Sequence, residues 1–318
     1  MIRRRITMAA IAMAGMGFAG AAAAQGYPSH NIELVVPATP GSSADIVGRV
    51  LAEGMTAKLG QPIIIQNKAG AAGMLGAAEV ARAKPDGYTL LHGAVYSLTV
   101  QPLTERQSTY TRKSFDGICQ TFKNDQVIVA RPNTYKNLAD ILAASKAKPG
   151  GLNYGSPGLT TIPHLSMIEL GRIAKVEFNH VPFRGPAESI QMTLGGQIDF
   201  AVAPLTAAAS SGLAMPALFA EKRNASIPDV PTVIEQGYDV APLSIGGLFV
   251  PTGTPADIKS KLDDACMTSM KNEAFQKVAR NTLQPADFMA DSAGFTRNID
   301  KDLADKQKLL TALGLAKN

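Results

Sequence analysis

The fold is first indicated by residues 32–65, IELVVPATPGSSADIVGRVLAEGMTAKLGQPIII, in which two apolar runs flank a helical pattern. The run Ile32–Val36 is rich in aliphatic residues and is typical of a buried strand. After a turn at residues 37–43, apolar side chains recur at helical spacing over residues 45–59, and Gly60 fits the position that ends such a helix. A strand, a helix and a second strand in this order predict a parallel sheet with helices on its faces.

The same alternation continues outward along the chain. Residues 70–84 carry a second helical pattern, and residues 88–91 carry a third strand. Beyond Asp125 we expect strands at 127–130, 152–154, 176–180, 198–202, 217–219 and 245–250, helices at 138–146, 162–173 and 187–194, and further helices between 256 and 315. These elements are too many for one small sheet. The pattern therefore predicts an α/β protein of two domains, with the last helices returning to the first domain.

The composition is that of a folded protein. Of the 318 residues, 46% are hydrophobic and 18% are charged, which excludes a disordered chain and allows one large core or two ordinary ones. Tryptophan is absent and aromatic residues make up only 6%, so a nucleic-acid surface of stacked rings is not expected. We therefore expect no nucleic-acid partner.

Residues 1–24 form a segment with its own pattern. Three arginines at positions 3–5 precede an apolar run at 6–21 and three alanines at 22–24, which is typical of a cleaved secretory signal. A retained anchor helix is the alternative, and the abundance of glycine and alanine argues against it. Cleavage before Gln25 lowers the formal net charge from +5 to +2. Because no later stretch has the roughly 20 apolar residues of a membrane span, the sequence predicts a soluble, exported mature protein.

Motifs for catalysis or metal binding are mostly missing. The four histidines have no metal-ligand spacing, and the chain has no G-x-S-x-G, C-x-x-C or phosphate-loop motif. We therefore expect neither a metal nor a cofactor. Cys119 and Cys266 lie far apart in the sequence, and two possibilities stay open for them: a disulfide bond or two separately buried thiols.

One pattern does recur: a strand, a turn of small residues and the start of a helix. It occurs at residues 40–45, 70–73 and 155–161. Each turn can present free backbone N–H groups and hydroxyls at the positive end of a helix, which suits a carboxylate or a phosphate. Ordinary helix capping is the alternative explanation. Because open α/β sheets bind ligands at the carboxyl ends of their strands, three such turns favour an anion-binding cleft.

Eight short blocks are spread in order over almost the whole chain after residue 24. They are Tyr27-Pro28, Val35-Val36-Pro37 with Pro40-Gly41 and Asp45, QNKAGAAG at 66–73, PDGYTL at 85–90, Tyr154-Gly155-Ser156 with His164-Leu165, HVPFRG at 180–185, PDVPT at 228–232 and PTGTP at 251–255. Together these blocks resemble the Bug family, the extracytoplasmic solute-binding receptors of tripartite tricarboxylate transporters.

The resemblance implies a two-domain periplasmic-binding-protein (Venus flytrap) fold, in which each domain is a mostly parallel sheet flanked by helices. Residues 25–123 and 243–318 would form a discontinuous first domain, and residues 124–242 the second, with hinges near 120–126 and 239–245. No catalytic residue is implied. The ligand-binding residues carried over are Gly41, Ser42, Ser43, Asp45, Ala72 and Gly73 in the first domain, and Ser156, Thr160, Thr161, His164, Pro182, Phe183, Arg184 and Asp199 in the second.

Several positions depart from the family's pattern, and two of them bear on the size and charge of the ligand. Ala38 stands where Phe is frequent, which would widen the cleft, and Arg184 replaces the common Lys and could bind a carboxylate through two N–H groups. These departures predict a ligand larger than a short amino acid, such as an aromatic or longer dicarboxylate. Alternatives stay open: a surface charge for Arg184, a capping or bracing role for His164, and stabilisation of the first helical turn for Asp45.

The resemblance therefore implies a periplasmic receptor that binds a di- or tricarboxylate and passes it to the membrane subunits of a transporter. A monomer is expected. Two alternatives stay open. One is an exported sensory receptor for the same ligands that signals to a membrane partner, and the other is an exported hydrolase, for which Ser156 and His164 are the available nucleophile and base.

Overall fold

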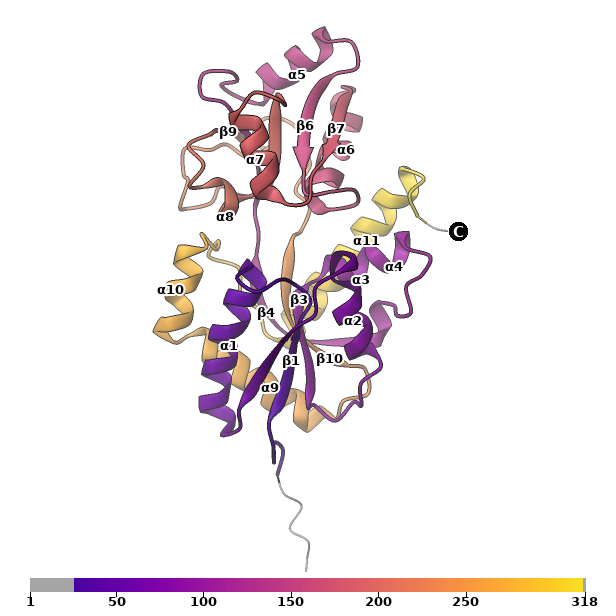
Figure 1. Cartoon of the computed structure of the whole chain (residues 1–318), viewed down its shortest axis with the longest axis vertical. Helices are drawn as coiled ribbons and strands as arrows, with labels where there is room; N and C mark the ends of the chain where they lie inside the picture. Colours follow the sequence, from indigo (N-terminus) through magenta and orange to yellow (C-terminus); the bar gives the residue numbers. More distant parts are fainter. Residues whose placement is uncertain (1–25, 317–318) are drawn as a thin grey trace, which may run out of the picture.

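The computed structural model describes residues 26–316, which form two domains stacked along the long axis of the molecule (Figure 1). The predicted signal segment and its cleavage site lie outside the described residues. Each domain is built on a five-stranded sheet flanked by helices, as the sequence predicts.

The first domain has the strand order β2-β1-β3-β10-β4. Its strands are β1 (Ile32–Val36), β2 (Ile63–Asn67), β3 (Thr89–Ala94), β4 (Phe115–Lys123) and β10 (Ile245–Pro251). Its helices are α1 (Ser43–Leu59), α2 (Met74–Ala81), α3 (Tyr96–Thr99), α4 (Gln101–Thr104), α9 (Ala256–Met270), α10 (Glu273–Asn281) and α11 (Ser292–Ala312), with 3-10 turns η1 (Ala71–Gly73) and η2 (Arg112–Ser114). The C-terminal helices thus return to the first domain.

The second domain has the strand order β7-β6-β8-β5-β9. Its strands are β5 (Gln126–Ala130), β6 (Leu152–Ser156), β7 (Phe178–Pro182), β8 (Phe200–Pro204) and β9 (Ala214–Phe219). Its helices are α5 (Leu138–Ala147), α6 (Ile162–Ala174), α7 (Pro186–Leu194) and α8 (Leu205–Ala208).

In each sheet one strand runs against the other four, β10 in the first domain and β5 in the second. Each reversed strand directly follows a segment that crosses from the other domain (Figure 1). The Asn124 amide donates to the Ser244 carbonyl at 2.7 Å and ties the two crossing segments together. The chain enters each sheet from the other domain, so the reversed strand begins at the edge of the sheet that faces that domain. The other four strands run in the opposite direction, and their carboxyl ends therefore lie at this same edge.

The first-domain core contains the disulfide that the sequence left open. Cys119 of β4 and Cys266 of α9 are bonded to each other, and both are fully buried in the cluster around Leu34, Leu51 and Met55. The bond therefore fastens a C-terminal helix to the sheet that the N-terminal part of the chain begins.

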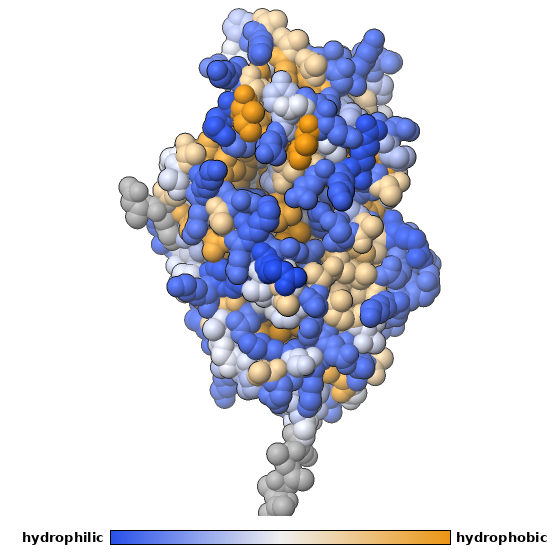
Figure 2. Space-filling view, turned by 180° about the vertical axis from the view of Figure 1, so that it is seen from behind, coloured by the Kyte–Doolittle hydropathy of each residue, from blue (hydrophilic) through white to orange (hydrophobic). Residues whose placement is uncertain are grey.

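An apolar contact also joins the domains. Leu165 of α6 packs against Val100, between α3 and α4, and Leu310 of α11, and all three are fully buried. Seen from behind, the surface is mostly hydrophilic, with apolar patches near the middle of the molecule (Figure 2). None of the described helices is both long enough and apolar enough to cross a membrane.

The sequence pattern did not predict β4. Its segment, FDGICQTFK, mixes polar and apolar residues, yet nearly all of the strand is buried. Gln120 donates to the Phe288 carbonyl at 2.7 Å and accepts from Asn298 at 2.9 Å, while Thr121 bonds to His92 at 2.9 Å. Tertiary hydrogen bonds thus allow polar side chains in the interior, which removes the periodicity that marks a strand.

Candidate functional site

Strands β1, β2 and β3 end side by side at the edge of the first sheet that faces the second domain. The turn after β1 leads into α1, where the Ser42 hydroxyl accepts a hydrogen bond from the Asp45 amide at 3.4 Å and caps the helix. Gly41 has a φ of +80°, a conformation that favours glycine. The predicted residues Gly41, Ser42, Ser43 and Asp45 therefore lie together at the start of α1.

The carboxylate of Asp45 is fully engaged inside the protein. It accepts from the Gly41 amide at 2.8 Å, from Asn67 Nδ2 at 2.9 Å, and from Arg49 at 3.0 Å and 2.9 Å. Burial alone would raise the pKa of this carboxyl, but these hydrogen bonds and the Arg49 charge lower it to about 2. Asp45 therefore braces the turn, and its negative charge is neutralised by Arg49. We call Asp45, Arg49 and Asn67 the carboxylate clamp.

Two backbone donors remain at the start of α1. Among the described residues, no acceptor bonds to the amides of Ser43 and Ala44, and the Ser43 side chain is exposed with no partner. The first N–H groups of a helix lack partners within it and carry a partial positive charge. With the Asp45 charge neutralised by the clamp, this helix end can attract an anion.

The second predicted turn lies beside the first one. Residues 70–73 connect β2 to α2 and contain η1, to which Ala72 and Gly73 belong. A Cβ placed on Gly73 would lie 3.7 Å from the Pro37 Cβ, and one on Gly76 would lie 2.9 Å from it, so α2 begins in close contact with the β1–α1 turn. Leu75, in the first turn of α2, is 59% exposed.

The third predicted turn connects β6 to α6 in the second domain. Ser156 is fully buried, and its Oγ lies 2.8 Å from His180 Nε2 and 3.3 Å from the Gly158 carbonyl. The hydroxyls of Thr160 and Thr161 donate to the Leu159 and Gly158 carbonyls, both at 2.8 Å. These three hydroxyls therefore shape the turn, and their protons are already committed to protein acceptors or to His180.

His164 and His180 stack beside this turn. Their ring centroids lie 4.1 Å apart, and His180 also lies 4.9 Å from the ring of Tyr154. Nδ1 of His164 accepts a hydrogen bond from the Thr160 amide at 3.2 Å. Burial lowers the pKa of His164 to about 4, with a further contribution from the neighbouring His180, and burial also lowers the pKa of His180.

The remaining predicted residues lie in two places. β6 and β7 are parallel with Ser156 opposite Pro182, so Pro182, Phe183 and Arg184 lie at the same edge as the 155–161 turn. The Arg184 side chain is exposed, and no described residue bonds to its guanidinium. Asp199 does not join this group: it precedes β8, at the opposite end of the sheet, where it bonds to Lys148 at 2.8 Å and to the Asn153 amide at 2.7 Å.

Three residues that organise these turns were not among the predicted site residues. Arg49 lies one helical turn after Asp45, a spacing at which opposite charges pair on a helix and which could have revealed it. Asn67 ends β2 opposite Val36, and His180 lies opposite Tyr154 in β7. Strand register brings Asn67 to Asp45 and His180 to Ser156, and the local sequence does not specify that register.

The hydrolase alternative required Ser156 to pair with His164. The structure instead pairs Ser156 with His180, and Ser156 is inaccessible to solvent. Within residues 26–316, no carboxylate bonds to either histidine ring, and no cluster of three or more potential metal ligands occurs. This arrangement lacks the exposed nucleophile and the oriented base that acyl transfer needs.

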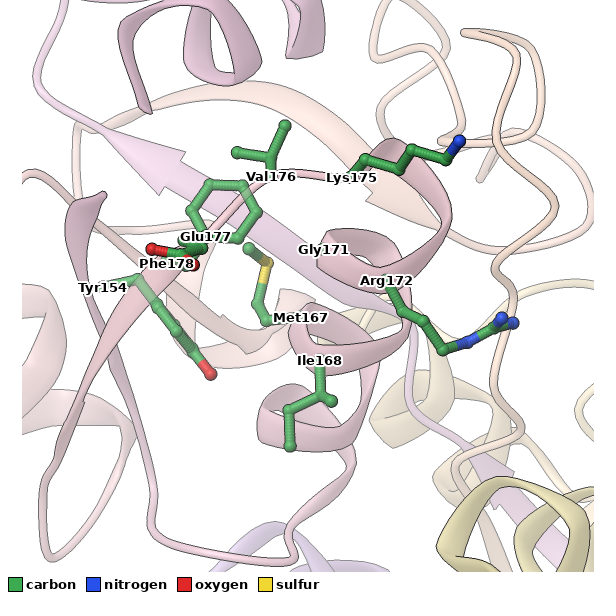
Figure 3. A pocket seen from close by; sticks show the side chains of 9 residues that line it. All are labelled: Tyr154, Met167, Ile168, Gly171, Arg172, Lys175, Val176, Glu177 and Phe178. Carbon is green, nitrogen blue, oxygen red and sulfur yellow. The ribbon is translucent and has the colours of Figure 1, made fainter. Parts of the chain in front are cut away.

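A cavity of about 490 Å³ lies elsewhere in the second domain, between the second half of α6 and the start of β7 (Figure 3). It is lined by Tyr154, Met167, Ile168, Gly171, Arg172, Lys175, Val176, Glu177 and Phe178. Arg172 and Lys175 extend outward at one side of it in Figure 3, and Arg172 bonds to Glu169 at 2.7 Å. None of the predicted site residues lines this cavity, which is at the far end of α6 from the 155–161 turn.

Several known proteins are similar to this chain in sequence and in structure. The model of the tripartite tricarboxylate transporter family receptor matches residues 47–315. A UPF0065 protein of Cupriavidus necator is 35% identical over 97% of this chain and 96% of its own length. A TctC solute-binding protein from Polaromonas is 27% identical, with a TM-score of 0.77 over 90% of this chain and 99% of that chain. A Rhodopseudomonas palustris protein with adipate, 23% identical, shares the fold, with a TM-score of 0.79 over 91% of this chain and 99% of its own.

Proposed function

This chain belongs to the tripartite tricarboxylate transporter family of receptors, and from this premise we propose that it captures a small organic carboxylate in the periplasm and delivers it to the membrane subunits of such a transporter. Members of this family are solute-binding receptors and not enzymes. The observation that carries the proposal is the pair of free amides, Ser43 and Ala44, at the start of a helix whose own carboxylate is neutralised.

The electrostatics of α1 favour an anion at this place. A helix end carries about half a positive charge, and a ligand carboxylate could accept from both free amides and from the Ser43 hydroxyl. Asp45 would repel such a ligand if its charge were free. Because Arg49 and Asn67 hold that carboxylate, the ligand meets the helix end rather than a bare negative charge.

The exposed side chains around the two turns favour a ligand with two acidic groups and an apolar body. Arg184 follows β7 at the edge that faces the first domain, and its guanidinium is free to bind a second carboxylate. Leu159 in the 155–161 turn is 66% exposed, and Leu75 at the start of α2 is also exposed. With the small side chain of Ala38 after β1, we expect an aliphatic or aromatic dicarboxylate longer than a short amino acid.

Capture would come from closure of the two domains on the ligand. We propose that residues 25–123 with 243–318 move against residues 124–242, and that the two crossing segments act as the hinge. Closure excludes water from the carboxylate and strengthens its hydrogen bonds. We also propose that residues 1–24 direct export and are removed, so that the mature receptor begins at about Gln25 and acts as a monomer.

Thermal unfolding of the mature protein with a panel of carboxylates tests this function. The panel contains malate, succinate, adipate, terephthalate, citrate and glutamate, applied after refolding from denaturant to remove any copurified ligand. An acid present at a hundred times its dissociation constant adds about 2.7 kcal/mol of stability, a shift of roughly 5 °C. No shift with any acid of the panel would contradict carboxylate capture, and uptake in a deletion strain separates delivery to a transporter from a sensory role.

Substitution of Ser43 tests the free amide directly. Ser43 is the first residue of α1, and Ser42 before it is extended, so Ser43→Pro should be tolerated there while it removes one N–H donor. We expect about tenfold or more weaker binding of the best acid of the panel, because hydrogen bonds to charged groups are among the stronger ones. Ser43→Ala, which keeps the amide, is the matched control and should bind more tightly than Ser43→Pro. Equal affinity of Ser43→Pro and the native protein would refute this site.

A further inference from the structure

The turn between β6 and α6 contains a strained residue. Thr160 has a φ of +56°, in the left-handed region that β-branched side chains rarely adopt, and Gly158 has a φ of +123°. A non-glycine residue keeps such a conformation only when its surroundings hold it there. Contacts with neighbouring residues must therefore hold Thr160 in this conformation.

His164 supplies the contact to the Thr160 backbone. The Thr160 amide donates to His164 Nδ1 at 3.2 Å, one turn ahead in the chain. A backbone N–H can only donate, so this nitrogen must carry a lone pair, and the proton of the neutral ring is on Nε2. A second proton, on Nδ1, would place two N–H groups against each other and break this contact.

His180 holds the other side of the turn. Its Nε2 lies 2.8 Å from the Ser156 hydroxyl, which in turn reaches the Gly158 carbonyl at 3.3 Å. Its ring stacks on His164 at 4.1 Å and lies 4.9 Å from Tyr154. The groups that face the pair are therefore Tyr154 and Ser156 of β6 and the two rings themselves. Within residues 26–316, no acidic or basic side chain bonds to either ring.

We propose that His164 and His180 are positioning residues that hold the 157–161 turn in the shape that receives the carboxylate, and that protonation of His164 releases the turn and weakens binding. This inference rests on the proposed function. A histidine that touched the ligand would behave in the opposite way, because an imidazolium attracts a carboxylate. The sign of the pH dependence therefore separates a brace from a ligand contact.

The first experiment needs no ligand. At pH 7.5, ¹⁵N NMR of the imidazoles should show His164 with an unprotonated Nδ1, and the Thr160 amide should be protected from hydrogen exchange. His164→Asn should keep this protection, because its side-chain oxygen can accept the Thr160 N–H without titrating. His164→Ala should lose it by about tenfold or more. If the Asn and Ala variants exchange alike, or if the native Thr160 amide is unprotected, the inference is overturned.

The second experiment measures binding of adipate and malate by calorimetry at pH 7.5 and pH 4. At pH 7.5 we expect His164→Ala to bind several-fold more weakly than the native protein and His164→Asn to recover most of the loss. At pH 4 the native protein should lose about twofold more affinity than His164→Asn, because about half of its brace is then protonated. Protonation of the acids themselves affects both proteins equally.

The outcomes of the two experiments separate this inference from the proposed function. A native affinity that rises at pH 4 relative to His164→Asn would show a ligand contact and refute the brace. If neither adipate nor malate binds, the carboxylate panel decides the proposed function. The NMR and exchange results then decide, by themselves, whether the histidines position the turn.

Discussion

The two domains use the same sequence pattern, a strand, a small-residue turn and a helix start, but they hold the turn in different ways. In the first domain the β1–α1 turn is held by the carboxylate clamp of Asp45, Arg49 and Asn67, in which Asp45 has a pKa of about 2. In the second domain the β6–α6 turn is held by two neutral histidines. The carboxylate clamp keeps its charge at any pH above about 4, whereas the histidine brace depends on remaining unprotonated.

This difference suggests separate roles for the two turns. The β1–α1 turn leaves two backbone amides free and has a permanent brace, so it is suited to be a fixed anchor for one carboxylate. The β6–α6 turn has its hydroxyls committed internally and contains a left-handed threonine, so it can change shape when its brace changes.

The largest expected effect comes from the disulfide, because both cysteines of the chain belong to the first domain. Replacing both by alanine should lower the free energy of unfolding by about 3–5 kcal/mol, since the bond closes a loop of 147 residues. Urea denaturation measures this, and hydrogen exchange should show the loss of protection concentrated in β4 and α9. A loss spread equally over both domains would mean that they unfold as one unit.

The next effect is on stability in acid. The folded pKa of His164, about 4, lies below its unfolded value of about 6.5, so its contribution is complete above pH 6.5 and is lost as the pH falls to 4. We expect the native protein to lose about 3 kcal/mol more than His164→Asn between pH 7 and pH 4, measured by urea unfolding. His92, buried in the first domain with its pKa lowered to about 4, contributes equally in both proteins.

Asp45 should respond only in stronger acid. Its folded pKa, about 2, lies below the unfolded value of 3.8, so its contribution is complete above about pH 4 and is lost as the pH falls toward 2. Hydrogen exchange at decreasing pH measures this order. If the amides of the β1–α1 turn lose protection before those of the β6–α6 turn as the pH is lowered from 7, the proposed difference between the carboxylate clamp and the histidine pair is wrong.

The smallest effect is expected from substitutions of two aspartates, Asp45 and Asp199, which the sequence analysis placed in one site. Asp45→Asn should lower the free energy of unfolding by about 2 kcal/mol, because it removes a buried carboxylate with several donors. Asp199→Asn should cost about 1 kcal/mol or less, because Asp199 and its partner Lys148 are partly exposed. Of the two, only Asp45→Asn should weaken binding in the carboxylate panel. Weaker binding by Asp199→Asn would place Asp199 back in the site.

Much of the fold could be predicted because its elements have clear periodicity. Residues 32–36 form β1 as expected, and α1 and α5 differ from the predicted helices by a residue or two at their ends. The parallel pairing of β1 with β2 and β3, and of β6 with β7 and β8, follows from the strand–helix order. β4 was not predicted, since Gln120 and Thr121 are buried through hydrogen bonds to residues far away in the sequence.

The candidate site, like the fold, was predicted from the sequence only in part. The small-residue turns at 40–45, 70–73 and 155–161 were predicted, because the end of a strand and the start of a helix leave local signals. Asp199 was placed in the site, but it precedes β8 and lies at the opposite end of the sheet. Asp199 was carried over from the family resemblance, although its place at the start of the expected strand 198–202 puts it at the opposite end of a parallel sheet from the turns that follow the strands.

The sequence by itself determined the two α/β domains, the turns that begin α1, α2 and α6, and the membership of a receptor family, because each depends on local periodicity or on blocks in a fixed order. The tertiary structure alone decided that Cys119 and Cys266 are bonded, that Asn67 of β2 donates to Asp45 of α1, and that Ser156 pairs with His180 rather than with His164. These contacts join residues from different elements, and only strand register and helix packing bring such residues within bonding distance.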